Sequence, residues 1–265
     1  MKGKMCVVTG GGGVLCSVLA RQLAERGASV VVLDLDADKA EQVATGIRSR
    51  GGNAMAVRAS VLDRDSLNGA AGLIEKEFGR VDVLINGAGG NRPGATTGKD
   101  RSFFDLEDES IRSVFDLNFL GSLLPSQVLG RMMVKQGEGV ILNIASMNAL
   151  RPLTRIPAYS AAKAAIANFT QWLAVHMAQE YSPRIRVNAI APGFFLTEQN
   201  RFLLQQEDGS LTKRGQQILD HTPMARFGEP EDLVGVVEWL VSPRADFVTG
   251  VVVPIDGGFS AFSGV

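Results

Sequence analysis

The sequence predicts an α/β fold in which helices cover both faces of a doubly wound, mostly parallel sheet of seven strands. Two observations lead to this prediction. Short apolar runs that end at turn residues alternate with longer segments of helical periodicity, and 265 residues suffice for one large domain with a sizeable core. Alternating strands and helices give parallel strands joined by right-handed crossovers. We therefore expect a single domain spanning 1–265.

The elements are expected in a regular order. Strands are expected near 4–9, 29–34, 53–59, 81–86, 138–144, 184–190 and 248–255, and helices near 14–27, 37–50, 63–78, 107–135, 157–181 and 229–241. The long connection 194–227 is expected to form a small lid, because long loops in compact domains are usually functional or disordered. Ligands of such sheets bind beyond the carboxyl ends of the strands, so residues that follow strand ends should converge on one site.

The turn after the first strand indicates a dinucleotide site. The chain reads TGGGG at 9–13 and continues into an apolar-periodic helix. Such a turn lets a pyrophosphate approach bare backbone at the positive end of a helix. The second strand ends at Asp34, 24 residues beyond Gly10. An acidic side chain about 20 residues after the glycines suits the ribose hydroxyls of NAD and repels the 2′-phosphate of NADP. We expect NAD, held by Asp34 or, alternatively, Asp36.

Ser146, Tyr159 and Lys163 have a spacing that indicates proton transfer. Residues four apart on a helix share one face, so Tyr159 and Lys163 can touch. A free phenol has a pKa of about 10, and an adjacent ammonium is expected to lower it and so prepare Tyr159 for acid–base catalysis. The Ser146 hydroxyl can hold a substrate oxygen. For this Tyr–Lys pair alone, an ordinary amphipathic helix would be the better interpretation; the other motifs favour the catalytic one.

Together these motifs resemble the short-chain dehydrogenase/reductase family over nearly the whole chain. The matching segments are TGGGG at 9–13, NGAG at 86–89, LNFLG at 117–121, the stretch from Ser146 to Lys163, and RVNAIAPG at 186–193 followed by Thr197. The resemblance implies an NAD(P)-binding Rossmann-type catalytic domain. It places Asn118, Ser146, Tyr159 and Lys163 on the catalytic positions. It also implies that Lys163 binds the nicotinamide ribose and that Asn118 holds a water linking Lys163 to solvent.

The same resemblance implies the cofactor contacts. They are Gly10, Gly12, Gly13, Val14, Leu15, Asp34, Ser60, Val61, Asn86, Ala88, Gly89, Tyr159, Lys163, Pro192, Gly193, Phe195 and Thr197. Three positions depart from the family pattern. Val14 and Cys16 replace the second and third glycines of its TGxxxGxG turn, and Ser60 stands where an Asp near the adenine is usual. Cys16 is small enough for the helix–strand packing that the third glycine serves, whereas Val14 requires a slightly different loop.

Two segments should determine the substrate. The polar insertion between Gly89 and Phe103, the lid, and DLNFLGSLLPSQV resemble the D-mannonate oxidoreductase (fructuronate reductase) branch of the family. This implies reversible, NADH-dependent reduction of D-fructuronate to D-mannonate. A hexuronate needs a cation for its carboxylate, and arginine offers a bidentate fork. The predicted substrate residues are Arg92, Asn148 and Arg155; further candidates nearby are Asn91, Arg151, Gln199, Asn200 and Arg201.

Composition excludes other classes of function. The formal net charge is −1 and there is no basic run, which argues against nucleic-acid binding. The apolar stretches are too short for a signal peptide or a membrane helix, so a cytoplasmic protein without membrane contact is expected. Cys6 and Cys16 indicate reduced core thiols. Neither His176 nor His221 has a partner at ligand spacing, so no metal is expected.

The subunit count and the exact substrate stay open. Apolar residues surround much of 107–135 and 157–181, which fits helices covered by both sheet and partner; the family resemblance implies a homotetramer through them. The substrate could be another sugar acid or polyol, such as a ketogluconate, because one arginine can serve many carboxylates. A non-catalytic dinucleotide-binding protein is the other alternative, and Val14 and Cys16 are its only support.

Overall fold

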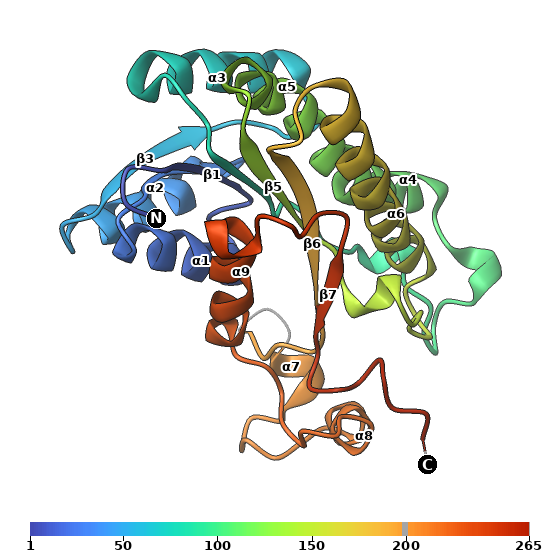
Figure 1. The fold of residues 1–265 in the computed structure, drawn as a ribbon. Helices are drawn as coiled ribbons and strands as arrows, with labels where there is room; N and C mark the ends of the chain where they lie inside the picture. The colour runs from blue at the N-terminus through green and yellow to red at the C-terminus, as the bar shows by residue number, and fades with distance from the viewer. Residues whose placement is uncertain (198–200, 265) are drawn as a thin grey trace.

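The computed structural model describes residues 1–197 and 201–264, and the strands in these ranges form one parallel sheet (Figure 1). The strand order is β3-β2-β1-β4-β5-β6-β7, and each neighbouring pair is parallel. The chain therefore starts mid-sheet, winds to one edge and returns to build the other, which creates a switch point between β1 and β4. The strands are β1 Met5–Thr9, β2 Ser29–Asp34, β3 Asn53–Arg58, β4 Val83–Asn86, β5 Gly139–Ile144, β6 Ile185–Pro192 and β7 Val252–Ile255.

Helices cover both faces of the sheet (Figure 1). They are α1 Val14–Glu25, α2 Ala37–Arg48, α3 Arg64–Phe78, α4 Asp108–Phe115, α5 Gly121–Gln136, α6 Pro157–Glu180, α7 Arg201–Leu204, α8 Lys213–Asp220 and α9 Val234–Val241. Successive strand residues point to opposite faces. Val8 packs in the core under α1, α2 and α9, whereas Val7 packs in the core under α3, α5 and α6. The doubly wound architecture predicted from the sequence is confirmed, and the sheet is parallel throughout.

The segment 107–135, predicted as one helix, is interrupted in the structure. A π-helical turn at Asp116–Leu120 separates α4 from α5. The insertion of an extra residue into a helical turn re-aims the side chains within it, and Asn118 is the residue that turns fully inward here. Two smaller differences concern the C-terminal elements: a 3₁₀ turn at Pro230–Leu233 precedes α9, and β7 begins only at Val252.

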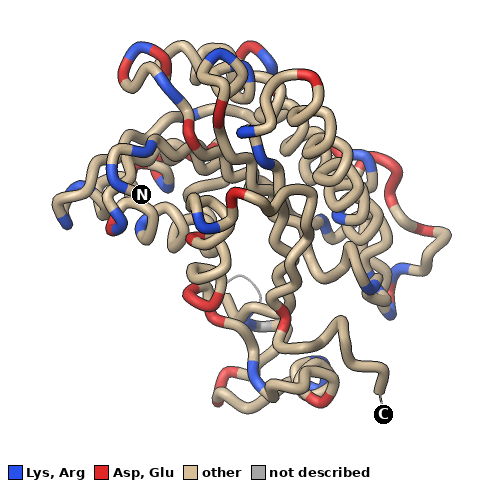
Figure 2. Tube along the Cα trace, viewed as in Figure 1, with Lys and Arg blue, Asp and Glu red and all other residues tan. Residues whose placement is uncertain are grey.

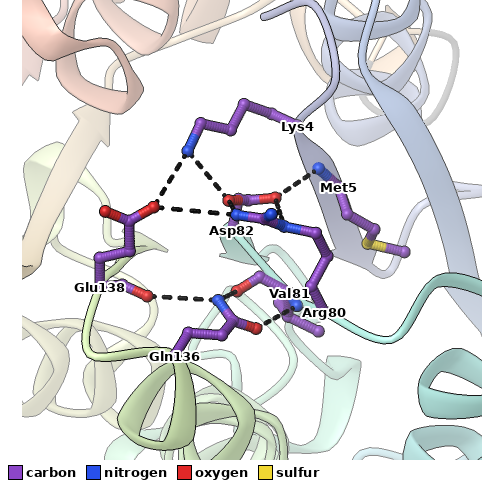
Figure 3. A network of polar contacts seen from close by, with 7 residues as sticks. All are labelled: Lys4, Met5, Arg80, Val81, Asp82, Gln136 and Glu138. Carbon is purple, nitrogen blue, oxygen red and sulfur yellow. Dashed lines mark hydrogen bonds and ion pairs between the residues drawn. The ribbon is translucent and has the colours of Figure 1, made fainter.

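The amino-terminal edge of the sheet is fastened by an ionic network (Figure 3). The buried Asp82 carboxylate accepts hydrogen bonds from Lys4 Nζ at 3.0 Å, from the Met5 backbone N–H at 2.8 Å and from Arg80 Nε at 2.8 Å. Lys4 also reaches Glu138 at 3.4 Å, at the start of β5. The network joins the entries of three strands at the edge opposite the glycine turn, so its role is structural.

The lid segment lies beyond the carboxyl ends of the strands (Figure 1). It contains the short helices α7 and α8, and its two ends are joined by hydrogen bonds from Gly228 N to Phe194 O at 2.8 Å and from Leu196 N to Gly228 O at 3.0 Å. The lid therefore leaves the sheet edge and returns to it at neighbouring positions. Within 1–197 and 201–264, no helix is both long and apolar enough to cross a membrane.

Candidate active site

The glycine turn leaves backbone open at the start of α1. Gly10 has φ +62°, and a Cβ there would lie 2.8 Å from the Cα of Ala88, so neither the turn nor the close approach to β4 admits a side chain. Gly13 precedes α1, and no acidic residue occupies the first turn of this helix. The helix therefore presents its positive end to the cleft, as a pyrophosphate site requires. Val14 and Leu15 are the first two helical residues.

Asp34 is fixed beside this turn by backbone donors. Its Oδ2 accepts a hydrogen bond from Gly12 N at 2.9 Å, and its Oδ1 accepts one from Asp36 N at 3.0 Å. Asp36 caps α2, since its side chain accepts from the N–H groups of Asp38 and Lys39. Of the two acidic residues considered for the ribose, Asp34 is the one held against the glycine turn.

Cys16 occupies the tight contact between α1 and the end of β4. It is buried, and its sulfur fills the space that a side chain at Gly87 would need. Thr9 holds the same loop, because its Oγ1 accepts from Gly87 N at 3.1 Å. Burial raises the pKa of the Cys16 thiol to about 12, so this cysteine is a packing residue. The sequence analysis did not identify the Thr9 side chain or the missing side chain of Gly87 as parts of this contact.

Gly89, Asn118 and Lys163 come together at the carboxyl end of β4. A Cβ at Gly89 would lie 2.7 Å from Asn118 Oδ1 and 3.4 Å from Lys163 Nζ. Asn118 donates from Nδ2 to the carbonyls of Gly90 and Val114, both at 2.7 Å, and its Oδ1 accepts from Gly90 N at 3.3 Å. The π-helical turn therefore carries an amide that fixes the loop beside the buried lysine.

Lys163 is a buried cation bound to a backbone carbonyl. Its Nζ donates to Ile144 O at 2.7 Å, and only 4% of the residue is exposed. Burial lowers the pKa of Lys163 to about 8. Sequence reasoning could not identify the Ile144 carbonyl as its partner, because a backbone acceptor leaves no mark in residue type.

Tyr159 lies next to Lys163, as the spacing predicts, and Ser146 lies near both. Lys163 Nζ lies 5.6 Å from the centre of the Tyr159 ring. Burial raises the pKa of the Tyr159 phenol, and the nearby Ser146 hydroxyl opposes that rise only in part. We expected the ammonium to lower this pKa, and the net direction is the opposite: the phenol stays protonated. Ser146 is also held in place, because its Oγ accepts from Asn148 N at 3.2 Å.

Asn86 lies in the interior of the sheet. Its Nδ2 donates to Ser126 Oγ and to Asn143 Oδ1, both at 2.9 Å, and Asn143 in turn donates to Thr170 Oγ1 at 2.9 Å. The side chain thus links β4 and β5 to α5 and α6, and its contact with a cofactor stays a prediction. Its Oδ1 is buried without a hydrogen-bond partner among the described residues.

Ser60 and Val61, the residues predicted to lie near the adenine, make contacts within the protein. Ser60 Oγ accepts from Leu62 N at 3.3 Å, and Ser60 N donates to Ser66 Oγ at 3.0 Å. Val61 is buried and lies against Gly121, where a Cβ would come within 3.1 Å of it. Their contacts with the cofactor remain predictions.

The segment expected to cover the nicotinamide leaves the end of β6. Pro192 is the last residue of that strand, and Gly193 N donates to Ile255 O at 2.9 Å. A Cβ on Gly193 would lie 2.6 Å from the Cβ of Asp256, so the chain must be bare there. Phe195 is buried, and the Thr197 carbonyl accepts from Arg201 N at 2.9 Å. The segment therefore runs from the strand end directly into the lid.

The predicted substrate residues lie on two neighbouring loops. Arg92 donates from Nε to Ser113 Oγ at 2.7 Å, which directs it toward α4. Asn148 is buried, and its Oδ1 accepts from Leu153 N at 3.2 Å, so it orders the loop after Ser146. The Arg155 carbonyl accepts from Thr97 N at 2.9 Å. This bond joins the two loops. Gln199 and Asn200 lie outside the described residues.

A cavity of about 630 Å³ lies between these loops, next to the start of α6. Its lining includes Lys99, Arg101 and Arg155 and ends at Pro157, the first residue of the helix that carries Tyr159 and Lys163. Arg101 pairs with Glu107 at 3.0 Å. Figure 2 shows basic residues on the loops beside this end of α6 and on α8. The cavity thus carries three cations beside the start of the helix that holds Tyr159. Lys99 and Arg101 were missed, although both lie in the insertion assigned to specificity.

These features fit a nicotinamide dinucleotide. The turn presents bare backbone at a helix start, Asp34 is fixed at the edge of that turn, and a buried lysine lies beside a tyrosine and a serine at the carboxyl edge of the sheet. Each group occupies the place where doubly wound sheets bind such ligands.

Comparisons with known proteins agree with the site. Residues 4–208 match the model of the short chain dehydrogenase family. The chain is 51% identical to an uncharacterised oxidoreductase, UxuB, of Bacillus subtilis, over 100% of this chain and 98% of that protein. It is 50% identical, with a TM-score of 0.94, to a Haemophilus influenza structure with bound NAD that is described as a candidate D-mannonate oxidoreductase; the match covers 100% of this chain and 98% of that one.

A further relative is more distant. The 5-keto-D-gluconate 5-reductase of Escherichia coli is 32% identical, over 97% of this chain and 96% of that protein. The family model covers most of the chain, and the relatives match it from end to end. The chain belongs to the short-chain dehydrogenase family and is an oxidoreductase.

Proposed function

We propose that the protein is an NAD(H)-dependent oxidoreductase that interconverts a keto and a hydroxy sugar acid, D-fructuronate and D-mannonate. The observation that carries this proposal is the cationic edge beside the catalytic helix, where Arg155 and Lys99 line one cavity. A neutral alcohol would have no use for these charges, whereas a carboxylate does. The Haemophilus neighbour described above supports the same substrate.

The geometry supports the following catalytic roles. Bound NADH would supply the hydride to the carbonyl carbon. The protonated Tyr159 phenol donates a proton to the carbonyl oxygen, and Ser146 holds and polarises that oxygen. In the reverse direction the same phenol oxygen takes the proton back. Lys163, fixed on Ile144 O, places a cation beside the ring and would bind the nicotinamide ribose.

NAD is the cofactor that the adenosine side of the turn favours. Asp34 accepts from Gly12 N, so its negative charge is held beside the glycine turn. This supports a site that repels the 2′-phosphate of NADP. Among the described residues 1–197 and 201–264, no arginine forms an ion pair with Asp34 that would neutralise this charge.

The test is a steady-state assay of the wild-type protein with D-fructuronate, 5-keto-D-gluconate and the neutral ketose D-fructose, each with NADH and NADPH. The proposal predicts the highest kcat/KM for D-fructuronate with NADH. Preference for 5-keto-D-gluconate would support the alternative suggested by the Escherichia coli reductase. Reduction of fructose with D-fructuronate inert would refute the sugar-acid assignment. Binding of NADH with no turnover of any ketone would favour the non-catalytic alternative.

We also propose a homotetramer built through α4, α5 and α6. Trp172 and Val175 on α6 are 57% and 56% exposed, and the Trp172 ring stacks on His176 with centroids 4.7 Å apart. An ordered aromatic surface of this kind on a long helix suits contact with a second subunit. Light scattering should give the mass of four chains at micromolar concentration, and a monomer would contradict the proposal.

A further inference from the structure

Arg214 is an unpaired cation on the lid. It is the second residue of α8, and its side chain is half-buried. No hydrogen bond or ion pair holds its guanidinium within the described part of the chain, whereas the lid arginine Arg201 donates to Gln205 Oε1 at 2.9 Å. An arginine that loses water without gaining an acceptor costs stability. A half-buried guanidinium without an acceptor is therefore a candidate ligand group.

A second cation, Arg155, lies near enough to Arg214 for their charges to interact. The pKa of Arg214 is lowered by burial and, next, by the charge of Arg155. Arg155 lines the cavity beside the start of α6, its backbone is fixed by Thr97, and its guanidinium has no acid partner among the described residues. Two like charges that face each other without an intervening acid repel, and an anion bound between them would remove that repulsion.

The element that carries Arg214 is held in place on both sides. At its start, Thr212 Oγ1 accepts from Gly215 N at 3.0 Å, and Gly215 packs directly on Leu204 of α7. At its end, the His221 ring contacts Phe259 and Phe262 of the C-terminal segment, with centroids 4.6 and 5.0 Å apart. The lid helix therefore presents Arg214 from a packed position.

The C-terminal segment also ties α8 to the catalytic loop. Arg151, five residues after Ser146, donates from Nε to Ser260 O at 3.2 Å. The neighbouring Phe259 is the residue against which His221 packs. The lid and the loop that carries the substrate candidates are thus joined through one short segment, so α8 with Arg214 and the loop with Arg155 lie close together.

We infer that Arg214 is a substrate-binding residue, and that Arg214 and Arg155 are two cationic arms that hold the carboxylate of the substrate between the lid and the start of α6. The inference rests on the proposed function, because it assigns the carboxylate end of the proposed sugar acid. The ketone end would lie at Ser146 and Tyr159. The two arginines then select for an acid over a polyol of the same chain length.

The experiment compares Arg214→Gln with Lys213→Gln, which removes one charge from the exposed side of the same helical turn. In NADH-dependent reduction, Arg214→Gln should raise the KM for D-fructuronate about ten- to hundredfold, as expected for a lost charge-assisted contact. The KM for NADH should stay within about twofold. Arg214→Lys should fall between wild type and Arg214→Gln, because it keeps the charge and loses the fork. Lys213→Gln should behave as wild type.

A binding measurement makes the inference independent of turnover. With NADH present, D-mannonate should raise the Tm of the wild type and of Lys213→Gln, and the neutral D-mannitol should not. Arg214→Gln should lose that shift, while its Tm without ligand should equal or exceed that of the wild type, because an unpaired half-buried charge is gone. Equal shifts in Arg214→Gln and wild type would overturn the role of Arg214.

The two proposals fail in different ways. If Arg155→Gln raises the KM for D-fructuronate and Arg214→Gln does not, the sugar-acid function stands and Arg214 does not bind the substrate. If the wild type turns over no sugar acid, but D-mannonate still raises its Tm and this shift is lost in Arg214→Gln, the two arginines form an anion site and the proposed substrate is wrong. Absence of any shift in the wild type would overturn the arginine pair.

Discussion

The sulfur of Cys16 fills the space that a side chain on Gly87 would need, so α1 and the loop after β4 interlock at these two residues. Cys16 stands where the family's glycine turn has its third glycine. The larger residue is accommodated because its neighbour has no side chain. The helix can then approach the strand closely enough to keep the glycine turn beside Asp34.

Replacing Gly87 with Ala should therefore destabilise the protein by about 1–3 kcal/mol, as overpacking of a tight core contact does. Adding Cys16→Gly should recover part of that loss, because the sulfur is removed. Recovery should be incomplete, since a Cβ at position 87 would also lie 2.9 Å from the Thr9 carbonyl. Urea unfolding of both single variants and the double variant measures the coupling. Strict additivity would show that the two residues do not interact.

Cofactor preference should depend on Asp34. Replacing Asp34 with Ser and Leu35 with Arg should relax or reverse the preference for NADH over NADPH, because the charge that repels a 2′-phosphate is exchanged for one that attracts it. Leu35→Arg alone is the matched control and should keep the preference for NADH. Steady-state kinetics with both cofactors and one fixed ketone gives the ratio. A wild type that prefers NADPH would contradict the role given to Asp34.

Lys163 should give the protein a distinctive stability profile above neutral pH. Its pKa is about 8 in the folded chain and 10.5 as the ordinary value, so between these values the unfolded chain binds the proton more tightly. Stability contributed by this group therefore rises with pH from about 8 upward. Relative to Lys163→Met, the wild type should gain roughly 1 kcal/mol between pH 7.5 and 9.

Comparison of wild type and Lys163→Met by urea unfolding at both pH values isolates this effect. The thiols of Cys6 and Cys16 also titrate differently in the two states, but they are common to both proteins and cancel. The exposed Lys76→Met is the control for the loss of a lysine side chain. A constant difference between wild type and Lys163→Met across this range would mean that the buried lysine keeps its ordinary pKa.

The ionic network around Asp82 should make a large contribution to the loss of folding stability at acid pH. Burial raises the pKa of Asp82, but hydrogen bonds from Arg80, Met5 N and Lys4 outweigh it, so the pKa lies below its ordinary 3.8. Its stabilisation is present above that value and is lost as pH falls through the lower, folded pKa. Asp82→Asn should cost about 2–4 kcal/mol at pH 7.

The exposed pair between Glu75 and Lys135 is the control for this network. Glu75→Gln should cost at most about 0.5 kcal/mol, because both partners are largely in water. Guanidinium unfolding at pH 7 and at pH 3 measures both variants. Asp82→Asn should also lose less stability than the wild type on acidification, and equal losses would show that Asp82 does not contribute to it.

The fold could be predicted from the sequence because strands and helices alternate with clear periods. Strand ends at Thr9, Asp34 and Asn86 were predicted correctly, since each is an apolar run that stops at a polar residue. The break in 107–135 was not predicted. The π-helical turn at Asp116–Leu120 ends at Gly121, and Pro125 lies inside the helix that follows. A proline cannot donate to the carbonyl four residues earlier, which is that of Gly121, so these two residues were the signal in the sequence.

The residue types of the candidate site could be predicted from the sequence. The burial and the contacts of these residues could not. Spacing identified Tyr159 and Lys163, because residues four apart on a helix meet, and the family resemblance placed Ser146 with them. The pKa of Tyr159 was predicted in the wrong direction, since burial of the phenol depends on tertiary packing. Likewise, no pattern in the sequence shows that Asn86 donates to Ser126 and Asn143 or that the charge of Arg155 acts on Arg214 of the lid.

The most direct test of the catalytic account is reduction of D-fructuronate by NADH in wild type and Tyr159→Phe under identical conditions, with NADH binding followed by its fluorescence. The phenol oxygen is the proton donor, so its removal should lower kcat by at least about a hundredfold and leave the Kd for NADH within about twofold. Turnover by Tyr159→Phe near the wild-type rate would contradict the account, because the proton would then come from another group.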